Sequence, residues 1–226
     1  MALGTNSFAN SGPLIFLSPR SKDKNKQDVP PHFEVGRAND KGEIVNDATT
    51  VTNVSGDLFK LEIKERTFED NVTKDAVLYL RDKTANESYR LPIRFGITGR
   101  GFFNRLASLT EKGDFTGLQI DYYRNKAGYD NFGLKQHSEN VSWKFANEDL
   151  PKPLEIKHPT TGKVLQRDYT EVNALFEQEL LAIAAKVNKT KPEEHAPAAQ
   201  KAPASAPKPA TASKAAAATP DEDVPF

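Results

Sequence analysis

Basic and aromatic side chains occur together in two stretches of this sequence. Charged residues line one face of "KLEIKER" (60–66), and "IDYYRNKAGYDNFGLK" (120–135) combines four rings with three cations. Cations pair with the phosphates of a nucleic acid, and aromatic faces receive its unstacked bases. The two ingredients together predict an interface for a single strand that does not read base sequence.

Strand alternation separates the side chains that reach this interface from those that fill the core. Tyr122 is expected to point inward and Tyr123 outward, because successive side chains of a strand face opposite sides. Phe59, Phe95 and Phe102 are expected in the core as well. The candidate interface residues are Lys60, Lys64, Arg66, Arg81, Arg90, Arg94, Tyr123, Arg124, Lys126, Tyr129, Phe132 and Trp143. The competing interpretation is that these rings pack internally and the cations form an ordinary solvated face.

Enzymatic chemistry has little support in the sequence. There is no cysteine, and the four histidines are too scattered for a metal site: His32, His137, His158 and His195. "GITGRG" (96–101) lacks the Lys-Ser/Thr ending of a phosphate-binding Walker loop. A two-metal nuclease site is a weaker alternative that would draw on Glu62, Glu65, Glu69, Asp70 and Asp121. We therefore expect a non-enzymatic protein without a cofactor.

Five strands and one helix must position the candidate residues. The strands are expected at 57–68, 75–82, 87–95, 116–125 and 128–137, with an edge or a bulge at Pro92. A helix is expected between the third and fourth strands, where Phe102, Leu106 and Leu109 have helical spacing and Gly113 suits the end. Five strands with a helix in this place predict a mainly β OB-fold barrel, a fold that binds oligonucleotides. Another small α+β sheet has the same elements.

The remaining segments define the boundaries of this domain. Residues 1–45 are expected to form a partly irregular arm and 46–188 the OB-fold domain. An extra helix near 168–188 carries a capping box, Asp168 with Glu171, and an apolar stripe formed by Val172, Leu175, Phe176, Leu180, Ile183 and Val187. The Ala/Pro/Lys-rich residues 189–220 have almost no bulky apolar side chains and are expected to be a disordered linker.

The overall charge does not point to a partner. Lys and Arg together number 31, as do Asp and Glu. The residues from Lys191 onward hold four Lys and five acids, so the rest has 27 basic and 26 acidic residues. Any basic surface must therefore be local. The absence of cysteine and of a signal peptide or membrane span predicts a cytoplasmic protein without a membrane partner.

The last six residues, "DEDVPF", combine an acidic cluster with an apolar end: Asp221, Glu222, Asp223, Val224, Pro225 and Phe226. This ending resembles the "DDDIPF" tip of bacterial single-stranded DNA-binding proteins. In that family a flexible linker carries the tip away from an OB-fold, and the tip recruits replication, recombination and repair proteins. A partner pocket can bury the Phe ring while basic groups meet the carboxylates.

The rest of the chain is more similar to divergent, phage-encoded members of that family. Its five-strand unit starts near residue 50, and it adds the helix near 168–188. The resemblance implies a protein that coats single-stranded DNA in the host cytoplasm and recruits partners through residues 221–226. A homo-oligomer is a further candidate partner, and the resemblance does not extend to the bacterial tetramer. The alternatives are an RNA-binding or protein-binding OB module, or a metal-dependent nuclease or annealing factor.

Overall fold

The computed structural model describes residues 13–68 and 71–189 of the chain. The strands are β1 Leu14–Lys22, β2 Asp28–Ala38, β3 Ile44–Val51, β4 Asn53–Phe68, β5 Asn71–Asp82, β6 Glu87–Arg94, β7 Leu118–Arg124, β8 Asp130–Gln136, β9 Glu139–Asn140, β10 Leu154–Lys157 and β11 Val164–Asp168. The helices are α1 Ile97–Lys112 and α2 Thr170–Val187. The five strands and both helices expected from the sequence are confirmed.

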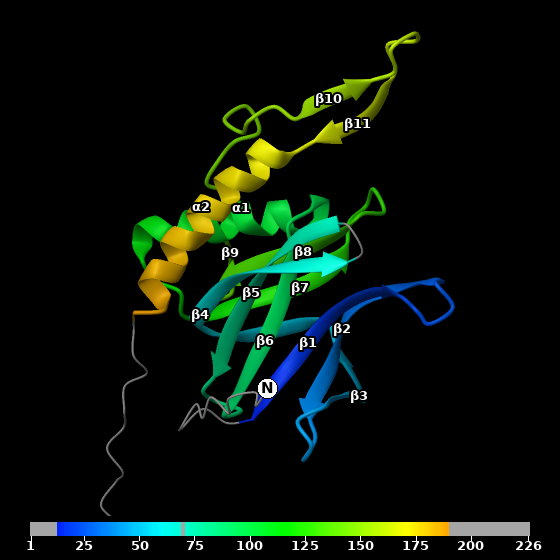
Figure 1. The fold of residues 1–226 in the computed structure, drawn as a ribbon. Helices are drawn as coiled ribbons and strands as arrows, with labels where there is room; N and C mark the ends of the chain where they lie inside the picture. The colour runs from blue at the N-terminus through cyan, green and yellow to red at the C-terminus, as the bar shows by residue number, and fades with distance from the viewer. Residues whose placement is uncertain (1–12, 69–70, 190–226) are drawn as a thin grey trace, which may run out of the picture. The chain divides into compact units, whose positions relative to one another are not determined.

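Nine of these strands form one mixed sheet in the order β3-β2-β1-β6-β5-β4-β7-β8-β9 (Figure 1). All neighbours are antiparallel except β1 and β6, which pair in parallel over Leu14–Phe16 and Ser88–Arg90. The long strand β4 joins the two halves of the sheet, because its first residues pair with β7 and its later ones with β5. The five strands expected from the sequence are therefore the contiguous block β6-β5-β4-β7-β8.

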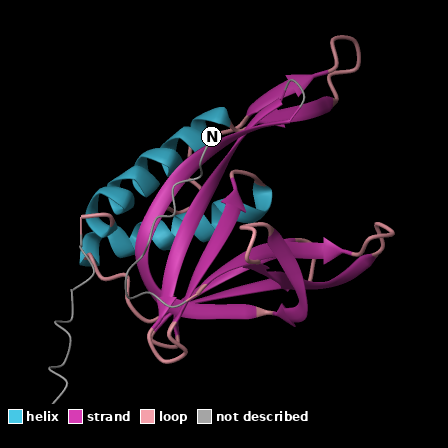
Figure 2. Cartoon of the chain, turned by 60° about the horizontal axis from the view of Figure 1, so that its bottom comes forward, coloured by secondary structure: helices cyan, strands magenta, loops and turns pink. Residues whose placement is uncertain are grey.

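The sheet curls so that strands far apart in its order share one core (Figure 2). Phe33 of β2 packs against Tyr122 of β7, with ring centroids 5.6 Å apart, and against Phe132 of β8 at 6.2 Å. Leu61, Leu78 and Leu91 are buried on the same side of the sheet as these rings.

Helix α1 packs its Phe102, Phe103 and Leu106 into this core. A Cβ atom at Gly99 would lie 2.3 Å from the Arg94 carbonyl oxygen, so only glycine lets the helix start this close to β6. Gly113 ends the helix in the left-handed conformation, as expected.

Helix α2 lies beside α1 and covers the edge of β4 that β7 leaves unpaired (Figure 1). Its apolar stripe is buried except for Leu175, which is half-buried. Asn188 at its end bonds both the amide and the carbonyl of Leu61, which satisfies the strand edge. The predicted capping box of Asp168 and Glu171 is wrong, because Tyr169 is the N-cap residue. Asp168 instead accepts hydrogen bonds from the amide and the hydroxyl of Thr170.

One expectation about the fold is wrong, and one is not confirmed. Residues 13–45, the described part of the expected arm, are not irregular, since β1, β2 and the start of β3 belong to the main sheet and bury Ile15, Leu17 and Phe33. In β2 the inward Phe33 and Val35 alternate with His32 and Glu34, which lowered the apparent apolar content. The predicted five-stranded OB-fold barrel is not confirmed, because the described strands form an open sheet of nine strands. In the nine-stranded sheet, β1 occupies the edge of β6.

Candidate nucleic-acid interface

The six strand cations predicted from the sequence lie on one face of β4, β5 and β6. Lys60 is in register with Tyr79, which is in register with Arg90, and Arg90 pairs with Phe16 of β1. The opposite face of the same strands holds the buried leucines. We call the outward-pointing cations the basic face: Lys60, Lys64, Arg66, Arg81, Arg90 and Arg94.

A β-bulge adds an aromatic ring to the basic face. The register of β4 and β5 shifts between Leu58 and Lys60, so the extra residue Phe59 turns to the outer side. Its ring lies 6.2 Å from that of Tyr79, and the Arg81 guanidinium lies 5.8 Å from it. The expectation that Phe59 is a core residue is wrong, because strict alternation does not allow for the bulge.

Phe16 supplies a second ring at the β1 side of the basic face. The Arg90 guanidinium lies 5.8 Å from its centroid. Phe16 and Phe59 are both half-buried, whereas Tyr79 is only 6% exposed and is covered by Lys60 at 5.0 Å. Phe16 and Phe59 are therefore the rings on this face that a base can reach. Phe16 is not among the residues predicted from the sequence, because residues 1–45 were expected to form a partly irregular arm.

Two carboxylates partly neutralise the basic face. Glu62 accepts hydrogen bonds from Lys60 at 2.9 Å, Lys64 at 3.0 Å and the Tyr79 hydroxyl at 2.9 Å. Burial raises the pKa of Glu62, but these three bonds outweigh it and lower the pKa to about 2. Asp75 lies 3.7 Å from both Arg66 and Arg94. Six cations against two carboxylates leave an excess of four positive charges.

Four of the other predicted residues, Tyr123, Arg124, Lys126 and Tyr129, form a second group around the β7–β8 turn. Tyr123 is exposed on β7, and Lys126 and Tyr129 lie in the turn, where Tyr129 is 64% exposed. Arg124 donates to Asp130 at 2.8 Å, an interaction that raises the pKa of the guanidinium. The side chain of Asn125 accepts bonds from the Ala127 and Tyr129 amides and so shapes the turn.

Phe132 is a correction to the predicted interface. It is only 4% exposed and stacks on Tyr122 at 4.7 Å, because the two residues are register partners on the inner face. It cannot receive a base without opening the core. The inward orientation of Tyr122, Phe95 and Phe102 agrees with the prediction.

Trp143 is half exposed, at 48%, on a segment fixed to both helices. The buried Asn104 of α1 accepts bonds from the Lys144 and Phe145 amides and donates to the Phe145 carbonyl. Lys144 also bonds both carboxylate oxygens of Glu179 on α2 at 2.8 Å. The Arg105 guanidinium lies 5.5 Å from the Trp143 ring, and a cleft of about 450 Å³ separates this ring from Tyr123.

The carboxylates considered for a nuclease site do not converge. Glu62 holds lysines on the basic face, whereas Asp121 bonds Gln119 and Lys135 on β7–β8. Glu69 and Asp70 lie outside the described residues, as do His195 and the predicted tip, residues 221–226. Within residues 13–68 and 71–189, no cluster of three or more His, Asp or Glu could hold a metal ion.

Comparisons of the chain with protein-family models, curated proteins and solved structures found no significant match. Neither helix of the described part of the chain is long and apolar enough to cross a membrane.

Proposed function

We propose that this protein binds single-stranded DNA along the basic face and coats it during replication or recombination. The observation that carries the proposal is that six cations from three adjacent strands share one face with the rings of Phe16 and Phe59. The cations suit a continuous phosphate backbone, and the rings suit unstacked bases. A duplex keeps its bases stacked and gains nothing from the rings.

The connectivity of the sheet supports the same proposal. The block β6-β5-β4-β7-β8 has its helix between the third and fourth strands, as in an OB-fold, and we propose that it is an open variant of that barrel. OB-folds bind oligonucleotides on the face of their second and third strands. Those strands correspond to β5 and β6, which carry Arg81, Arg90 and Arg94.

The acidic tip supports the second half of the proposal. Asp221–Phe226 combine carboxylates with an aromatic end, and this pattern suits recruitment of replication or recombination proteins with a basic, apolar pocket. Removing residues 219–226 is expected to leave DNA affinity unchanged or higher while abolishing recruitment. A deletion that destroys DNA binding would contradict this division of roles.

The test is a titration of the full chain with labelled dT oligomers, measured by fluorescence anisotropy at several salt concentrations. Each phosphate contact is expected to contribute about 0.7 to the slope of log affinity against log salt. A matched duplex should bind far more weakly. Equal affinity for the duplex would overturn the proposal, tighter binding of an rU oligomer would assign the face to RNA, and cleavage of the oligomer with added Mg²⁺ would reveal a nuclease.

A further inference from the structure

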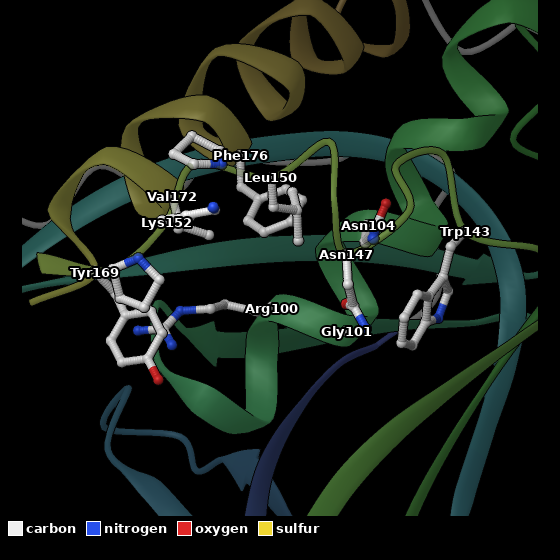
Figure 3. Close-up of a pocket in the computed structure, with 12 residues that line it drawn as sticks. Arg100, Gly101, Asn104, Trp143, Asn147, Leu150, Lys152, Tyr169, Val172 and Phe176 are labelled. Carbon is white, nitrogen blue, oxygen red and sulfur yellow. The ribbon is translucent and has the colours of Figure 1, made fainter. Parts of the chain in front are cut away.

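A second cavity lies away from the strand cations, between α1, α2 and the segment that joins β9 to β10. Its volume is about 310 Å³, and its walls are mainly apolar. Figure 3 shows Tyr169 and Trp143 at opposite ends of the cavity, with Leu150 and Phe176 between them. A cavity of this size is at the lower end of the range for ligand sites and suits one large side chain with its main-chain atoms.

The charged side chains that line this cavity are all positive. Arg100 and Lys152 line it, and none of the lining residues carries a carboxylate. The Arg100 guanidinium stacks on the Tyr169 ring at 3.6 Å and donates to Asn173 at 3.1 Å. Both partners are neutral, and none of the ion pairs found among residues 13–68 and 71–189 includes Arg100.

A partly buried cation without an anionic partner is costly to maintain. Burial lowers the pKa of Arg100, which reflects the loss of hydration of its charge. An incoming carboxylate would pair with the guanidinium in surroundings where such a bond is strong, and it would recover part of that loss. A cavity with apolar walls and one cationic end is therefore complementary to a ligand that has an apolar body and one carboxylate.

The backbone and side chains around the cavity, which form its frame, are held in place by contacts within the protein before any ligand binds. Asn104 and the Lys144–Glu179 pair hold the backbone beside Trp143, and the Tyr169 ring is held against Arg100. A site whose walls do not have to be ordered on binding loses less conformational entropy. An exposed tryptophan on such a frame is the kind of residue that dominates protein-binding sites.

We propose that this cavity captures the carboxyl-terminal residue of a peptide from a partner protein. A large apolar or aromatic terminal side chain occupies the space between Trp143 and Tyr169. Its terminal carboxylate pairs with Arg100, and Lys152 at the rim attracts the preceding acidic residues. The inference does not rest on DNA binding, because no residue of the basic face lines the cavity.

The test uses the full chain and the fluorescence of Trp143, which is the sole tryptophan. The probes are acetylated hexapeptides that end in Phe, Leu or Ala, each as the free acid and as the carboxamide. We expect saturable changes with the Phe and Leu acids, at least tenfold weaker binding of their amides, and no binding of the Ala peptides. Equal affinity for acid and amide, or no saturable change with any acid, would overturn the proposal.

Variants separate this site from its surroundings. Arg100→Gln should weaken the Phe peptide at least tenfold and Lys152→Gln severalfold. Arg105→Gln is the matched control, because this cation also contacts Trp143 but lines the other cleft, and it should change peptide affinity less than twofold. Since Arg100→Gln also alters the stack on Tyr169, the exposed Lys152 keeps the test valid if that variant misfolds. If both variants instead weaken a dT oligomer and spare the peptide, the cavity belongs to the DNA path and the proposal is wrong.

Discussion

The basic face and the cavity that Arg100 lines differ in how their positive charge is distributed and paired. On the basic face, Glu62 and Asp75 lie among outward-pointing cations, and the excess charge is spread over three strands. In the cavity, one cation is half enclosed by apolar groups and paired only with neutral ones. Spread charge suits a long polyanion, whereas a single enclosed charge suits one carboxylate.

The contrast between the two regions is tested most directly by removing positive charge from the basic face. The triple variant Arg81→Gln, Arg90→Gln, Arg94→Gln should lose about 4 kcal/mol of binding to a dT oligomer, roughly a thousandfold, because three phosphate contacts disappear. Peptide binding in the cavity should not change. The matched control is Lys157→Gln, Lys163→Gln, Arg167→Gln on the β10–β11 ribbon, which removes the same charge elsewhere. Equal losses in both triples would show that net charge, and not this face, governs affinity.

The fixed frame of the cavity is tested through Asn104. Asn104→Ala leaves the part-buried amide and carbonyl of Phe145 without their side-chain partner, while the Lys144 amide keeps its bond to the Asn104 carbonyl, so the free energy of unfolding should fall by about 2 kcal/mol. Chemical denaturation measures the loss, and the emission of Trp143 should shift to the red. Asn147→Ala, at an exposed residue that lines the same cavity, is the control and should be close to neutral. An unchanged unfolding curve for Asn104→Ala would remove the argument for a prearranged site.

Stacking on the basic face is tested at Phe16. Phe16→Ala should weaken binding of a dT oligomer by about 1–3 kcal/mol, and Phe16→Tyr should retain most of the affinity because it keeps the ring. Phe16→Leu separates stacking from apolar contact, since it keeps an apolar side chain without a π face. Val45→Ala, on the exposed β3, is the control. If Phe16→Leu binds like the wild type, the ring contributes no stacking.

A variant of Glu62 tests whether this carboxylate lowers the net positive charge that the basic face offers to DNA. Glu62→Gln removes the carboxylate that neutralises Lys60 and Lys64, so affinity for a dT oligomer should rise by about 1 kcal/mol, roughly fivefold. Glu155→Gln is the matched control, because Glu155 bridges Lys157 and Arg167 on the ribbon. A fall in affinity would mean that Glu62 orients the two lysines for binding and does not compete with phosphate.

The carboxylate of Glu62 also makes stability depend on pH. The folded pKa of Glu62, about 2, lies below its ordinary value of 4.5. Its carboxylate therefore contributes stability that is present above pH 4.5 and is lost as the pH falls toward 2. Urea denaturation between these values should give a shallower decline of unfolding free energy for Glu62→Gln than for the wild type. Parallel curves would mean that the ion pairs of Glu62 do not affect folding.

The sequence predicted local structure better than the placement of whole segments. The five strands, α1 and most of the apolar stripe of α2 follow from periodicity, because each element must bury one face. Phe59 and Phe132 were misassigned for different reasons. A bulge reverses the side on which Phe59 points, and the register of β8 against β7 turns Phe132 inward. Neither a bulge nor a register leaves a reliable mark in a single sequence.

The sequence alone determined that the cations and rings concentrate in the strands and that the chain ends in an acidic, aromatic segment. Those properties belong to individual residues and their nearest neighbours along the chain. Only the tertiary structure decided that β1 pairs with β6 and brings Phe16 to Arg90, and that Arg100 shares a cavity with Trp143. These contacts join residues distant in sequence, and they form because the curled sheet and its two helices must bury one common core.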